Sequence, residues 1–242
     1  KKINKLDFNN LHNFLWLSLV DRKSNGKILQ KIINIWILKH SKYKRNIWES
    51  SILSKRIISW ILNVDIILNN GTFGFKKNFL DSIVSQTNHL KKNIKFEKDY
   101  SKRIEALTAL SLSGLVFKEY IDNYKTGIKE LEKLVKNYFD DDGFPLTRNP
   151  SDLIFFSKYL LLCKECIKDA QGYIPDFLDA IINKNLICIK NILTPVDNVP
   201  LFNGGIEENL EGFSKFINNL EYKLKDKKNI IGGIHTLNVR NH

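Results

Sequence analysis

Apolar residues recur at helical spacing along almost the whole chain, and this periodicity restricts the fold more than any other feature. Between residues 103 and 120 the apolar positions fall near one face of a helix; they are Ile104, Leu107, Leu110, Leu115 and Val116. Comparable segments span 8–20, 28–40, 52–68, 79–96, 131–138, 150–167, 177–192 and 208–224. The sequence therefore predicts an all-α fold of roughly nine helices, joined by short connections as antiparallel helical hairpins.

The last part of the chain has a different pattern. Residues 230–239 alternate between two sides in the manner of a strand, and Gly232-Gly233 marks a bend. A single strand cannot satisfy its own backbone hydrogen bonds, so we expect its partners to lie beyond His242. Because Met is absent, we interpret the chain as a piece of a longer reading frame. The expected organisation is a helical domain at 1–228 and the start of a truncated β-domain at 229–242.

The formal charge of +12 indicates an anionic partner, which could be nucleic acid, a membrane surface or an acidic polysaccharide. Biased coding is the competing explanation, because the excess of Lys accompanies an excess of Ile and Asn. The Lys residues are scattered over every segment instead of forming one stripe, which disfavours nucleic acid. No apolar run approaches the roughly eighteen residues of a membrane span. The first residues show no signal-peptide core, so the compartment is not determined.

The three cysteines do not describe a disulfide framework. Cys163 and Cys166 form a C-x-x-C pattern inside an amphipathic helix, without a second ligand pair at zinc-site spacing. We interpret them as core residues and predict no metal and no cofactor. Residues 71–74, which contain two glycines, are too short for a phosphate-binding loop and are predicted to form a turn.

Several side chains could bind a sugar acid, although each also has a structural interpretation. Arg56 and Trp60 are four residues apart and share a helix face; with Trp48 they could stack on sugar rings and bind a carboxylate or sulfate. A core tryptophan beside a structural arginine is the alternative. His89 follows Asn88 and could move a proton or bind substrate, or it could be a hydrogen-bonded residue between helices.

The most specific segment is the polar turn from Asp142 to Ser151, between two strongly amphipathic helices. It carries Arg148, Asn149 and Ser151, and turns on a rigid helical scaffold commonly hold binding groups. We predict that these three residues bind substrate. The alternative is that they only cap the neighbouring helices.

Four motifs in order resemble those of the bacterial heparinase II/III family, and together they extend over nearly the whole chain. They are residues 11–17 (LHNFLWL), Trp48 with 56–60 (RIISW), Asp142-Gly143 with 148–151 (RNPS), and 200–205 (PLFNGG). The resemblance implies an incomplete α/α toroid of helical hairpins followed by an antiparallel β-sandwich, which agrees with the strand pattern at the end. It also implies a periplasmic location.

The resemblance further implies eliminative cleavage of uronic-acid polysaccharides, which needs a carboxylate-neutralising group, a base and an acid, usually Tyr and His. In such lyases an Asn or His lies on the helix that matches 101–116, and a Tyr lies in the segment that matches 142–152. This chain has Arg103 and Glu105 in the helix and no Tyr between Gly143 and Lys158. A further catalytic His would belong to the missing β-domain.

We therefore leave the catalytic residues unassigned and add Arg103 to the substrate-binding candidates. The expected function is binding of an acidic polysaccharide, which the whole protein would also cleave by elimination. We expect the chain's own β-domain to be a further partner and the isolated fragment to be inactive. The alternative is a non-catalytic helical scaffold that binds a polyanionic glycan or a protein.

Overall fold

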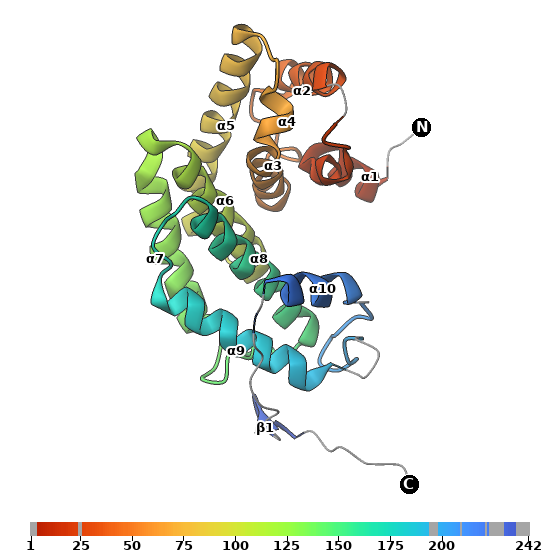
Figure 1. Ribbon diagram of the computed structural model, residues 1–242, viewed down its shortest axis with the longest axis vertical. Coiled ribbons are helices and arrows are strands. Elements are labelled where there is room, and N and C mark those ends of the chain that lie inside the picture. Colours follow the sequence, from red (N-terminus) through yellow and green to blue (C-terminus); the bar gives the residue numbers. More distant parts are fainter. Residues whose placement is uncertain are drawn as a thin grey trace. The chain divides into compact units, whose positions relative to one another are not determined.

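Figure 1 shows the computed structural model, which describes residues 4–23, 26–193, 198–208, 210–220, 222 and 230–235. Within these residues the chain forms ten α-helices, three short 3-10 helices and one sheet of two strands. The prediction of a mainly α-helical chain is confirmed. In the same residues each helix is too short or too polar to cross a lipid bilayer.

The chain divides into two compact units, residues 1–130 and 131–242. The first contains α1 (Lys5–Asn13), α2 (Gly26–His40), α3 (Ser50–Leu62), α4 (Val64–Leu68), α5 (Phe73–Asn93) and α6 (Tyr100–Val116), with 3-10 helices at Leu15–Leu19, Ile94–Phe96 and Lys118–Tyr120. Helix α7 (Ile121–Tyr138) begins in the first unit and ends in the second. The second unit continues with α8 (Pro150–Asp169), α9 (Asp176–Ile192), α10 (Glu211–Asn219), β1 (Ile230–Ile231) and β2 (Ile234–His235).

Helix α3 lies at the centre of the first unit, where it packs against α1, α5 and α6. Its Trp60 side chain is fully buried, with ring centroids 5.3 Å from Phe14, 5.5 Å from Trp36 and 5.1 Å from Phe79. Such tilted and edge-on aromatic pairs add to the free energy gained by burying their area. Most of the α3 surface is therefore internal, and its first two turns, with Ser51 and Lys55, and its last residue, Leu62, are the parts that reach the surface.

Two of the expected helices are interrupted, and in each case an asparagine forms the local hydrogen bonds. The predicted helix 8–20 ends at Asn13, whose side-chain oxygen accepts from the N–H of Leu15, and Phe14 has a left-handed φ of 59°. The predicted helix 52–68 divides at Asn63, whose amide donates to the carbonyl of Ser59. Asn side chains compete with helical backbone bonds in this way. The turn predicted at 71–74 is present only in part, since Thr72 caps α5 and the helix begins at Phe73.

The second unit is organised around the loop between α7 and α8. Phe144 is fully buried, and Tyr138 stacks on Phe156 with ring centroids 4.3 Å apart. Gly143 has a φ of 85°, and a Cβ atom there would lie 2.4 Å from Cβ of Lys184 on α9. This loop therefore requires glycine for both its conformation and its close approach to α9.

The end of the described chain is a hairpin, so the prediction of a strand without a partner is wrong for residues 230–235. Ile230 pairs with His235 and Ile231 with Ile234, in antiparallel register. Gly232 and Gly233 have φ values of 58° and 74°, which a two-residue hairpin turn with positive φ at both central positions requires. The glycine pair thus turns the chain back on itself. Residues 236–239 of the predicted strand lie outside the described residues.

A buried polar cluster connects α1, α2, α3 and α5 in the first unit. The Arg56 side chain is fully buried; its Nε donates to Oε1 of Gln86 at 2.6 Å, and its guanidinium lies 4.5 Å from the ring centroid of Trp36. Burial lowers the pKa of Arg56 to about 9, so it stays protonated at neutral pH. His12 accepts from the indole N–H of Trp36 through Nδ1 at 2.9 Å. Burial, and then the nearby His40, Arg56 and Lys44, lower the pKa of His12 to about 4.

This pKa predicts a loss of stability in acid. At neutral pH His12 is neutral in both the folded and the unfolded chain, but below its ordinary pKa of 6.5 the unfolded chain takes up the proton first. The free energy of unfolding should therefore fall as the pH drops from about 6.5 to about 4. Denaturant unfolding across this range measures the slope.

The matched variant is His12→Gln, which keeps an acceptor for the Trp36 indole and does not titrate in this range. It should show a smaller slope than the natural chain, although some slope should remain because burial also lowers the pKa of His40 and His89. Equal slopes for the two chains would contradict this account of His12.

Candidate functional site

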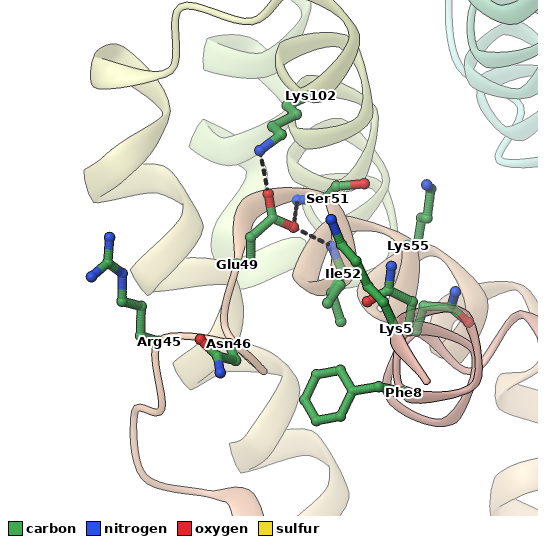
Figure 2. A pocket seen from close by; sticks show the side chains of 11 residues that line it. Lys5, Phe8, Arg45, Asn46, Glu49, Ser51, Ile52, Lys55 and Lys102 are labelled. Atoms are coloured by element: carbon green, nitrogen blue, oxygen red, sulfur yellow. Dashed lines mark hydrogen bonds and ion pairs between the residues drawn. The ribbon is translucent and has the colours of Figure 1, made fainter. Parts of the chain in front are cut away.

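A groove of about 700 Å³ opens on the first unit beside the first turn of α3 (Figure 2). It is formed by α1, the turn that precedes α3, the first turns of α3 and the start of α6. The residues that line it are Lys5, Phe8, Asn9, Asn13, Arg45, Asn46, Glu49, Ser51, Ile52, Lys55 and Lys102. Its size falls within the range of ligand-binding clefts.

The lining is predominantly cationic. It holds four positive side chains and three amides against the single carboxylate of Glu49. Lys55 lies 3.1 Å from Glu105 and Lys102 lies 2.6 Å from Glu49, so these two cations are already paired. Lys5 and Arg45 are exposed and have no ion-pair partner among the described residues. Two cations are therefore available to an incoming anion.

Glu49 links the base of the groove to α3. Its Oε2 accepts from the N–H groups of Ser51 and Ile52 at 3.0 and 3.2 Å, which caps the helix, while its Oε1 faces Lys102 (Figure 2). Burial alone would raise the pKa of Glu49, but the hydrogen bonds from Lys102 and these N–H groups lower it. The bond to Glu49 in turn raises the pKa of Lys102. Glu49 therefore stays ionised, and it neutralises the N-terminal end of α3.

Arg56 holds two walls of the groove in place from beneath. Its Nη1 donates to the carbonyl of His12 at 2.8 Å and to the carbonyl of Ile47 at 3.1 Å. His12 immediately precedes Asn13 at the end of α1, and Ile47 immediately follows Asn46 in the turn before α3. One buried guanidinium thus joins the two chain segments that bring Asn13 and Asn46 into the groove.

Solved structures provide the comparison for this fold. The heparan sulfate lyase HepC from Pedobacter heparinus is 16% identical with a TM-score of 0.68, over 89% of this chain and 36% of that chain. A heparinase III structure is 18% identical with a TM-score of 0.69, over 87% and 36%. A heparinase III with methylated lysines is 19% identical with a TM-score of 0.63, over 91% and 32%. This chain shares their fold.

The heparinase-like fold confirms the resemblance that the sequence motifs indicated. The chain spans about one third of the length of these solved structures. No protein-family model matches the chain, and no curated protein matches it in sequence.

The candidates in the turn before α8 are engaged in structural bonds. Arg148 pairs with Asp140 through Nη1, and its side chain is about one third exposed. Asn149 caps α8 by accepting from the N–H of Ser151 at 2.8 Å, and the Ser151 hydroxyl accepts from the N–H of Ile206 at 2.9 Å. None of the three lines the groove. These contacts favour the capping interpretation.

The remaining candidates lie in the first unit in different surroundings. Arg56 and Trp60 are fully buried, which favours their structural interpretation because no sugar ring can reach either side chain. Arg103 pairs with Glu130 at 3.1 Å and is about one third exposed. His89 is half-buried and lines a separate, smaller cavity with Tyr43 and Trp48.

The groove residues were missed by sequence reasoning. Asn13 lies inside the first resemblance motif, but Lys5, Arg45 and Lys55 carry no local signal that separates them from the many other Lys and Arg residues. Only the packing of α1 beside the turn before α3 brings them together. In the described part of the chain no group of His, Cys, Asp and Glu could hold a metal ion. Cys163 is fully buried, and burial raises its pKa to about 12.

A single substitution separates the two interpretations of Arg148. Arg148→Ala should lower stability by about 1 kcal/mol, because Asp140 loses its ion-pair partner at a site that is only partly exposed. Affinity for uronate oligosaccharides should not change. Thermal unfolding and a binding titration on the same variant provide both readouts. Lys136→Ala, which removes the more exposed pair with Glu132, is the control and should change neither. Weaker binding with unchanged stability would restore Arg148 as a ligand contact.

Proposed function

We propose that this chain binds an acidic polysaccharide containing uronic-acid units, and that it does so in the groove beside α3. The observation that carries the proposal is the lining: four cations and three amides surround one carboxylate that is already paired. A cleft lined by one sign of charge raises the local concentration of ligands of the opposite sign.

The unpaired groups suit the chemistry of a sugar acid. Arg45 offers a guanidinium fork, which matches the two oxygens of a carboxylate or the oxygens of a sulfate. Asn46 follows Arg45 directly and Asn9 lies on α1, so amide donors and acceptors are available for sugar hydroxyls. The half-buried ring of Phe8 provides an apolar surface for a sugar face (Figure 2).

The similarity in fold also supports a proposal about the whole protein from which this chain comes. The chain would be the helical portion of a bacterial heparinase II/III-like protein, with its hairpins forming part of an α/α toroid. The domain boundary near residue 229 and a partner β-domain belong to this proposal. The matched solved structures are named as heparan sulfate lyase and heparinase III, which supports a polysaccharide as the ligand.

Cleavage is a separate step from binding. Elimination requires a base and an acid placed at the reacting sugar, and the described residues that line the groove include neither Tyr nor His. The groove supplies groups that could neutralise a uronate carboxylate. We therefore assign binding to this chain, and the non-catalytic scaffold is the second candidate for the whole protein.

The unpaired cations provide the test of binding. Removing both charges in Lys5→Gln/Arg45→Gln should weaken binding of uronate oligosaccharides by about tenfold, close to 1.4 kcal/mol. The salt dependence of the affinity should also decrease, because fewer charges interact with the ligand. Isothermal titration at two ionic strengths measures both effects.

The control for net charge is Lys76→Gln/Lys77→Gln on α5, which removes two exposed cations outside the groove. It should bind as the natural chain does. If both double variants lose affinity equally, the binding reflects the overall charge of +12 and the groove is not the site.

Lyase activity of the chain should be undetectable. Elimination leaves a C4–C5 double bond that absorbs in the ultraviolet, so incubation with heparan sulfate or alginate should give no increase in absorbance. The reason is that a missing acid–base group commonly costs a factor of about 100 to 10,000 in rate. A steady increase with the purified chain would place the missing base and acid within these 242 residues.

A further inference from the structure

A second cavity, of about 180 Å³, lies beside the groove in the first unit. Ser50 lines this cavity, whereas its neighbours Glu49 and Ser51 line the groove, so the two sites flank the first turn of α3. The cavity is smaller than the roughly 300 Å³ at which sites for drug-sized ligands begin. It therefore suits a single ring.

Three aromatic rings form a fixed wall of the cavity. The imidazole of His89 lies 5.1 Å from the ring of Tyr43 at 32° and 5.1 Å from the ring of Trp48 at 83°. Trp48 is buried, and its indole N–H donates to the carbonyl of His40 at 3.2 Å. Tyr43 is 60% exposed although its ring contacts both neighbours. Tyr43 therefore presents an exposed aromatic surface of the kind that can pack against the C–H face of a sugar.

The charge carried by the cavity lining is opposite in sign to that of the groove lining. Glu97 supplies a carboxylate, Asn93 an amide and Ser50 a hydroxyl, and none of the described Lys and Arg residues lines the cavity. Burial, followed by the nearby Lys92, lowers the pKa of His89, so the imidazole is neutral at neutral pH. These groups can exchange hydrogen bonds with hydroxyls, whereas Glu97 repels an anion.

We propose that this cavity is a subsite for one uncharged hexose ring, stacked on Tyr43 and hydrogen-bonded by His89, Asn93 and Glu97. The proposal rests on the proposed function in taking the ligand to be a glycan. A polymer that occupies both sites would place an acidic sugar in the cationic groove and an uncharged sugar in the adjoining cavity. The chain would then recognise a sequence of sugars and not charge alone.

The test uses three monosaccharide probes on the full chain: the methyl glycosides of N-acetylglucosamine, glucuronic acid and glucosamine. Binding is followed by the NMR signal of the Trp48 indole N–H, assigned by its loss in Trp48→Phe. The N-acetylglucosaminide should shift this signal, and the glucuronide should bind about tenfold more weakly because of Glu97. Tighter binding of the glucosaminide would overturn the proposal in favour of an ammonium site.

Three variants test the residues. Tyr43→Ala should weaken binding of the uncharged probe by roughly fivefold, while Tyr43→Phe, which keeps the ring, should stay within about twofold. Glu97→Gln should remove most of the discrimination against the glucuronide. Phe96→Ala is the matched control, because Phe96 is 70% exposed and does not line the cavity. An unchanged affinity in Tyr43→Ala would overturn the proposal.

The outcomes for the two sites can be told apart. The uncharged probe does not need the groove cations, so Lys5→Gln/Arg45→Gln should bind it as the natural chain does. If that probe binds and acidic oligosaccharides do not, the groove proposal fails and the subsite stands. If acidic oligosaccharides bind and the Trp48 signal does not respond to the uncharged probe, the subsite proposal fails alone.

Discussion

The buried guanidinium of Arg56 is the interaction on which the first unit depends. It is fully buried and contacts only neutral groups among the described residues: the carbonyls of His12 and Ile47, the amide of Gln86 and the face of Trp36. Nε and Nη1 of Arg56 make three hydrogen bonds, whereas Nη2 has no hydrogen-bond partner among the described residues. Those three bonds and the face of Trp36 are therefore what offsets the cost of burying the charge. The end of α1 and the turn before α3 must therefore take up fixed positions around it, and those positions create the groove.

The same arrangement explains why charge gathers at the start of α3. The core uses most of the rest of that helix, so the groove forms at its first two turns. Glu49 caps this turn and pairs with Lys102, which fixes one side of the groove, while Lys5 and Arg45 have no ion-pair partner in the part of the chain that the structure describes. The carboxyl group on the other side of the turn, Glu97, belongs to the aromatic cavity. The two sides of one helix end thus carry side chains of opposite charge, which is the basis of the selectivity that we propose.

In the second unit the most distinctive segment, Asp142–Ser151, makes structural contacts. Asp140 accepts from the N–H groups of Asp142 and Phe144 and pairs with Arg148, and Asp142 accepts from the N–H of Gly232. Gly143 lies against α9 where no larger residue fits. The Asp142–Ser151 segment thus joins a loop, a helix cap and the C-terminal hairpin, which explains why its composition is specific without requiring a ligand.

The sequence by itself determined the helical class, the approximate helix positions and the resemblance to heparinase II/III proteins, because apolar periodicity and ordered motifs are local properties. It indicated an anionic partner through the net charge, but among its candidates for binding were Arg148, Asn149, Arg56 and Trp60. In the structure Arg148 forms an ion pair, Asn149 caps a helix, and Arg56 and Trp60 lie in the core. Only the tertiary structure selected Lys5, Arg45 and Tyr43. In the sequence nothing distinguishes these three residues from other surface residues. The groove and the cavity that they line form only where packing brings distant segments together. The terminal hairpin was decided by the positive φ of two adjacent glycines, a backbone property that the alternation of side chains does not report.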